Sequence, residues 1–94
     1  MVAVQEEVEV AITARLNRQV GSSMEMTYRN TSAECVTFDP LVLGSDGVNV
    51  DVHDFESLGQ PIATITLNGG AERVVFFKLR VGTQTPVARN ERPC

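Results

Sequence analysis

Apolar and polar residues alternate along most of this chain, and a period of two predicts β-strands that turn one face toward a core. In the first run, residues 7–16, an apolar side chain stands at every second position. A helix is the alternative there, because several of the same residues also fit a spacing of 3.6. The β-branched side chains and the polar positions between them favour the strand.

Further runs with this alternation follow, and turn residues separate them. They cover residues 22–29, 35–43, 48–53, 61–67, 72–81 and 85–90. Turns are predicted at residues 17–21, 44–47 and 68–70, where asparagine, aspartate and glycine are found. Pro40 interrupts the third run and marks a bulge, an edge or a change of sheet, because proline has no N–H for the ladder. The predicted fold class is all-β, an antiparallel β-sandwich of six to seven short strands.

Length and composition are those of one globular domain over residues 1–94. Of these 94 residues, 43% are apolar and 21% are charged, which is an ordinary globular balance. No apolar run approaches the ~20 residues that a membrane-spanning helix needs, so we expect no membrane span. The first residues lack the basic region and apolar stretch of a signal peptide, and the compartment is left open.

The net charge of −4 is unevenly distributed. Residues 1–71 hold three basic and ten acidic side chains, whereas residues 72–94 hold five basic and two acidic ones. An acidic chain repels the phosphate backbone, so we do not expect nucleic-acid binding. We interpret the basic residues near the C-terminus as solvated charges on strand edges.

Three stretches resemble bacterial immunoglobulin-like domains. Residues 24–38 are similar to the segment in which an alternating strand ends at an N-x-S/T triplet and the next strand opens with valine, threonine and phenylalanine. Residues 65–77 resemble the leucine, turn glycine and aromatic strand that follow, and residues 47–59 occupy the place of a D-G-x-x-V hairpin. The resemblance extends to intracellular proteinase-inhibitor domains. It implies an immunoglobulin-like sandwich.

The chain has two cysteines, Cys35 and Cys94, and one histidine, His53. These three residues cannot supply the four ligands of a structural zinc site. A disulfide between the cysteines would close a long loop and stabilise the fold by roughly 4 kcal/mol. The alternative is a buried thiol at Cys35 and a loose terminal thiol at Cys94. Both interpretations stay open, and so does the redox compartment.

No constellation of residues indicates catalysis. We predict that His53 is exposed on the polar face of a strand, and no nucleophile-elbow sequence accompanies it. The acidic residues between 46 and 56 lack the spacing of a calcium loop and are interpreted as solubilising charges. The stripe of Met24, Met26 and Tyr28 is assigned to the core. We therefore expect no enzyme activity, no cofactor and no metal site.

The leading functional hypothesis is a non-catalytic protein-binding or accessory module. Its partner would be another protein or a larger host chain, bound through loops at the ends of the sandwich or through an edge strand. The candidate loop residues are Asn30, Thr31, Ser32, Glu56, Ser57, Leu58, Thr83 and Gln84.

Two alternatives remain. A proteinase inhibitor would present an extended loop at residues 54–60 or 82–86, as the resemblance to inhibitor domains suggests. A structural subunit would pair its terminal edge strands with a larger chain or with a second copy of itself. The Asn30-Thr31-Ser32 triplet also matches a glycosylation acceptor, but we interpret it as a turn.

Overall fold

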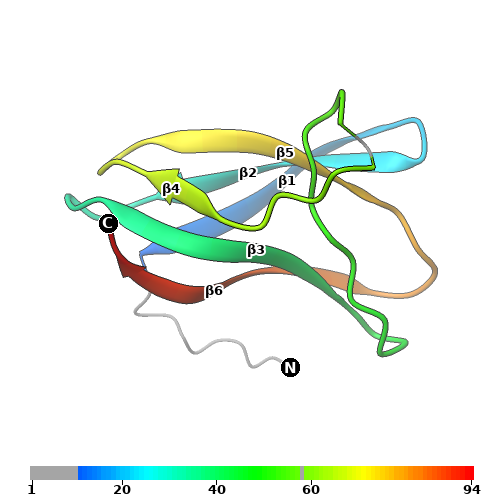
Figure 1. The fold of residues 1–94 in the computed structure, drawn as a ribbon. Helices are drawn as coiled ribbons and strands as arrows, with labels where there is room; N and C mark the ends of the chain where they lie inside the picture. The colour runs from blue at the N-terminus through cyan, green and yellow to red at the C-terminus, as the bar shows by residue number, and fades with distance from the viewer. Residues whose placement is uncertain (1–10, 58) are drawn as a thin grey trace.

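The computed structural model describes residues 11–57 and 59–94, and these residues form two antiparallel sheets of three strands each. The two sheets lie as two layers (Figure 1). The first sheet has the order β1-β2-β5, with β1 (Ile12–Val20), β2 (Ser23–Asn30) and β5 (Glu72–Lys78). The second has the order β4-β3-β6, with β4 (Ile65–Leu67), β3 (Val36–Gly44) and β6 (Gln84–Pro93). The predicted all-β fold is confirmed.

The hairpin of β1 and β2 is longer than the sequence pattern predicts. The turn predicted at residues 17–21 begins too early, because β1 continues to Val20. A bulge at Asn17 makes this continuation possible: the pairing skips this residue, and its side chain donates to Thr27 Oγ1 at 2.8 Å. Gly21, with a φ of 61°, then closes the turn. Residues 7–10 of the predicted first strand lie outside the described residues.

The core lies between the two sheets. Met26 and Tyr28 of β2 are fully buried, and Met24 is partly buried against them, so the predicted core stripe is confirmed. The ring of Tyr28 packs on Phe38 of β3 at a centroid distance of 5.0 Å. Its hydroxyl donates to the carbonyl oxygen of Val87 in β6 at 2.9 Å, which ties the two sheets together. Burial raises the pKa of the Tyr28 hydroxyl above its ordinary value.

Pro40 lies inside β3, the central strand of its sheet, and costs no ladder bond there. Val42 exchanges both backbone hydrogen bonds with Val50, at 2.8 and 3.0 Å. Because backbone groups alternate in direction along a strand, Pro40 turns its nitrogen toward the same side as Val42. On that side β4 pairs only with residues 36–38 of β3. The proline therefore occupies the gap between β4 and Val50, where no donor is needed.

The strand predicted at residues 48–53 is not continuous. The structure has two isolated bridges instead, from Val50 to Val42 in one sheet and from His53 to Phe76 in the other. The segment therefore crosses from the second sheet to the first. His53 is only 4% exposed, so the prediction of an exposed histidine is wrong. The main chains of His53 and Phe76 exchange two hydrogen bonds of 2.8 Å. These bonds hold His53 against the edge of β5 that faces away from β2.

The last three strands differ from their predicted limits. β4 is three residues long and β5 ends at Lys78, whereas β6 extends over ten residues to Pro93. β6 accommodates a bulge at Asn90, whose φ is 54°. Asparagine tolerates this left-handed conformation, and its amide donates to Asp39 at 2.9 Å. In the described part of the chain, no helix has the length and apolar character to cross a membrane.

Candidate functional site

The predicted partner-binding loops lie on separate parts of the molecule. Thr31 and Ser32 follow β2 at one end of the sheets, next to the turn that leads into β5. Thr83 lies at the other end, where its N–H donates to the hydroxyl of Ser45 at 3.0 Å. Glu56 and Ser57 directly follow Phe55, whose ring packs on Phe76 of β5. The structure therefore does not bring these loops together into one surface.

Three of the eight loop residues need separate mention. Leu58 lies outside the described residues. Gln84 is the first residue of β6 rather than part of a loop. Asn30 is the last residue of β2, and its side chain is fully buried. Asn30 is therefore closed to a partner, and to a glycosylating enzyme, while the protein is folded.

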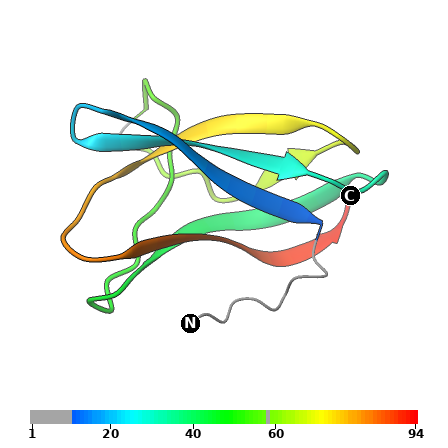
Figure 2. The same cartoon turned by 180° about the vertical axis from the view of Figure 1, so that it is seen from behind.

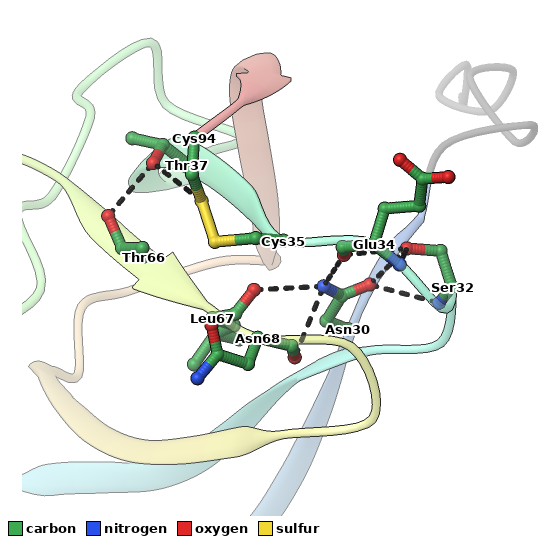
Figure 3. Close-up of a disulfide and its surroundings, with 9 residues drawn as sticks. All are labelled: Asn30, Ser32, Glu34, Cys35, Thr37, Thr66, Leu67, Asn68 and Cys94. Carbon is green, nitrogen blue, oxygen red and sulfur yellow. Dashed lines mark hydrogen bonds between the residues drawn. A yellow bond between two sulfur atoms is a disulfide. The ribbon is translucent and has the colours of Figure 1, made fainter.

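The amide of Asn30 is a hydrogen-bonding centre between the sheets (Figure 3). Its nitrogen donates to the carbonyl oxygens of Glu34, Leu67 and Asn68 at 2.7, 3.0 and 3.3 Å. Its oxygen accepts from the N–H and the hydroxyl of Ser32 at 2.9 and 2.7 Å. A buried amide is stabilising when its donors and acceptors are satisfied in this way.

The structure joins Cys35 and Cys94 in a disulfide, so both cysteines are bonded (Figure 3). The two Cα atoms are 5.6 Å apart. Cys35 comes just before β3 and Cys94 just after β6, so the bond fastens the end of the chain to the start of the central strand. This bond and the Asn30 amide lie at the same end of the sheets, and both stabilise the fold there.

Neither segment proposed for proteinase inhibition is a loop that is extended over its whole length, because residues 54–60 form turns and residues 84–86 belong to β6. Ser57 N–H donates to the carbonyl oxygen of Asp54 at 3.1 Å, and Gln60 N–H donates to Ser57 at 2.9 Å, so two turns follow each other. In the other segment, Gly82 has a φ of 91° and β6 begins two residues later. The inhibitor alternative therefore gains no support from the structure.

Two of the acidic residues between 46 and 54 form ion pairs with arginines. Asp46 accepts from Arg80 and Asp54 accepts from Arg73, each at 2.9 Å. Within residues 11–57 and 59–94, no group of three acidic, histidine or cysteine side chains is placed to hold a metal ion. The hydrogen bond from Arg80 and the N–H of Val48 lower the pKa of the Asp46 carboxyl below its ordinary value.

We expect a carboxyl titration to show this effect at Asp46. The lowered pKa means that this carboxyl stabilises the fold above the ordinary aspartate pKa of about 3.9, and that the contribution is lost as the pH falls through its own lower value. Arg80→Ala should move the Asp46 midpoint upward and leave that of Asp39, whose partners are Asn90 and Arg92, unchanged. NMR detection of the side-chain carboxyl carbons measures both. Equal midpoints in wild type and variant would contradict the assignment.

The outer strands of the two sheets differ in how well their free edges are closed. On the outer side of β5, His53 pairs with Phe76, and the ring of Phe55 packs on Phe76 at 4.9 Å. β4 offers only three residues. A short or covered edge resists pairing with another chain.

The edge of β6 is closed by its prolines. Val42 directs its backbone groups toward Val50, so Pro86, its partner in β6, turns its nitrogen away from β3. Pro93 stands in the equivalent position opposite Val36. Both prolines therefore face the free side without a donor, and the bulge at Asn90 interrupts the strand between them. Prolines and bulges are common devices against edge pairing.

The edge of β1 has neither device before Asn17. Thr31 N–H donates to the carbonyl oxygen of Ala11, so Ala11 directs its carbonyl toward β2. The backbone groups alternate in direction, so those of Ile12, Ala14 and Leu16 point away from β2. Among the described residues, no strand pairs with that side of β1. We call these three residues the β1 edge.

On the inner side of the β1 edge, Ile12 is buried in the core, but Ala14 and Leu16 are uncovered. Leu16 is 48% exposed, although its partner Met26 across the hairpin is fully buried. Ala14 is likewise exposed opposite the buried Tyr28. β1 starts close to β6, where Ala11 N–H donates to Glu91 at 3.0 Å, and the two strands then diverge (Figure 2). The second sheet therefore leaves Ala14 and Leu16 exposed.

Basic side chains flank the β1 edge on the outer face. Arg18 pairs with Glu25 at 3.2 Å, and Arg15 donates to the side chain of Asn17 at 3.1 Å. Arg15 forms no ion pair with the described acidic residues. The edge thus combines free backbone groups, an exposed leucine on one face and, on the other, an arginine that pairs with no acidic side chain of residues 11–57 and 59–94.

Sequence reasoning placed Ala14 and Leu16 on one face with Ile12 but did not single them out as a site. The available signal was the row of Arg15, Asn17 and Arg18 on the opposite face, which is typical of an edge strand. Neither protein-family models, nor curated proteins, nor solved structures gave a match to the chain.

Proposed function

We propose that this domain is a non-catalytic protein-binding module that takes up an extended segment of another protein along the β1 edge. The observation that carries the proposal is that β1 presents three residues with free backbone groups, whereas the other outer strands are short, covered or blocked by proline. An added strand would exchange main-chain hydrogen bonds with the β1 edge.

The side chains around the edge suggest what such a segment looks like. Side chains of an added strand alternate between the two faces. On the inner face they would lie beside Ala14 and Leu16, which favours apolar residues. On the outer face they would lie beside Arg15, which favours acidic residues. The preferred partner segment therefore alternates apolar and acidic residues.

The immunoglobulin-like class is part of the same proposal. Its support is the sequence resemblance together with the strand order, in which the chain changes sheet between β2 and β3, between β4 and β5 and again between β5 and β6. Connections of this kind are frequent in β-sandwiches. Binding by an edge strand or by loops is common in such folds.

A selection from a random peptide library tests the proposal. Peptides selected on the wild-type protein are titrated into ¹⁵N-labelled protein, and we expect amide shifts at Ile12, Ala14 and Leu16. Ala14→Pro removes a donor only from the free side of β1 and adds a ring there, so affinity should fall about tenfold or more. Val81→Pro, in an exposed turn, is the matched control and should bind normally. Selected peptides that shift only loop residues would refute the proposal.

A further inference from the structure

The first ten residues of the chain have the character of the segment that the β1 edge should accept. Valine stands at four of the five even positions, and three glutamates follow one another closely. The valines are Val2, Val4, Val8 and Val10, and the glutamates are Glu6, Glu7 and Glu9. This stretch is therefore both apolar at alternate positions and acidic. Charge and pattern are complementary to the β1 edge and to Arg15.

We infer that two copies of this chain associate through their N-terminal strands, with residues 4–10 of each copy paired antiparallel to the β1 edge of the other. This inference rests on the proposed function, because it names the partner that uses the same edge. The arrangement is a self-complementary pair in which each copy is both donor and acceptor. It joins the two β1-β2-β5 sheets into one continuous sheet.

The direction of the backbone groups restricts the register. On the β1 edge the free groups belong to the even residues Ile12, Ala14 and Leu16. Hydrogen-bonded pairs across the two copies must therefore join even residues to even residues. A two-fold axis at Val10 places Val8 opposite Ile12 and Val4 opposite Leu16. Val4 and Val8 then face apolar partners and cover Leu16 and Ile12, while Glu6 lies opposite Ala14 on the same face.

The same register brings the charges together on the outer face. It places Gln5 opposite Arg15, with Glu7 as the diagonal neighbour of that arginine. Opposite charges at these distances stabilise paired strands by a modest amount. Arg15 has no acidic partner among the described residues of its own chain. The outer face thus selects an acidic strand, and the inner face selects a valine-rich one.

Sedimentation equilibrium of the full chain tests the inference directly. The mass should rise with concentration from the 10.2 kDa of one copy toward twice that value and stop there. Hydrogen exchange at Ile12, Ala14 and Leu16 should slow over the same concentration range. A mass that stays at one copy throughout would overturn the inference.

A matched pair of variants locates the contact. Val4→Asp with Val8→Asp places two charges on the inner face, and association should weaken by about tenfold or more. Ala3→Asp with Gln5→Asp adds the same charge on the outer face, beside Arg15, and association should be unchanged or stronger. Circular dichroism checks that both variants keep the strand content of the wild type. Equal weakening by both pairs would contradict the register and the inference.

The edge itself is tested by Ala14→Pro, with circular dichroism as the check on folding. This variant should remain a single copy at every concentration. If selected peptides bind the wild-type β1 edge but the wild type does not associate, the self-association fails and the proposed function stands. If Ala14→Pro changes neither association nor peptide binding, both fail.

Discussion

Replacing both cysteines, as Cys35→Ala with Cys94→Ala, is expected to lower the free energy of unfolding by roughly 4 kcal/mol. The disulfide closes a loop with a sequence separation of 59 residues, and the cross-link restricts the unfolded chain over that whole length. All of β3, β4, β5 and β6 lies within this loop. Urea unfolding of the oxidised wild type and of the double variant measures the difference.

The control is the wild type in a strong reductant. Its free energy of unfolding should fall to the value of the double variant, because both lack the same cross-link. A mass measurement with and without reductant should show two additional hydrogen atoms on the reduced chain, because each sulfur becomes a thiol. A double variant within 1 kcal/mol of the oxidised wild type would contradict the stabilising role of this bond.

The second large effect is expected for Asn30→Asp. At neutral pH the substitution replaces a donating –NH₂ group by a carboxylate oxygen that faces the carbonyl oxygens of Glu34, Leu67 and Asn68. The site is fully buried, so water cannot compensate the repulsion. We expect the free energy of unfolding to fall by about 3–5 kcal/mol, measured by urea unfolding at neutral pH.

Ser32→Ala serves as the matched control for this substitution. It removes one hydroxyl from the accepting side of the same amide and leaves the three donated bonds in place. Its cost should be about 1 kcal/mol. An Asn30→Asp protein as stable as wild type would show that the amide does not hold the ends of the two sheets together.

The sequence pattern predicts the strands well where one face of a strand is buried. The alternation in β2 identifies Met26 and Tyr28 as core residues because both sheets cover that face completely. It also predicts β3 and β5 to within a few residues. The turn at residues 68–70 is found where asparagine and glycine allow it, with a φ of 79° at Gly70.

The alternation of apolar and polar residues gives wrong predictions where contacts with other segments determine the structure. His53 alternates with valines as an exposed strand residue would, but it pairs with Phe76 of β5 and is buried there. Asn17 is a typical turn residue, but its side-chain bonds to Thr27 and Glu25 keep it in β1 as a bulge. These contacts join residues far apart in the chain or across a hairpin, so local periodicity does not contain them.

The β1 edge could be predicted only in part for the same reason. The polar row beside Arg15 indicates an edge strand, and the sequence predicts a terminal edge strand as one of the contact surfaces. Pro86 and Pro93 close the edge of β6, and His53 closes the edge of β5. Both effects depend on the register of strand pairing, which the sequence alone does not fix. The exposure of Leu16 depends on the divergence of β1 and β6.

Hydrogen exchange along β1 in dilute solution tests the central point, that this strand keeps an open edge. The amides of Thr13 and Arg15, which are bonded to β2, should exchange slowly. The amides of Ala14 and Leu16, which belong to exposed residues, should exchange fast, so that protection alternates residue by residue. Uniform slow exchange from residue 12 to residue 16 in a dilute single copy would show that the edge is already covered, and would contradict the account.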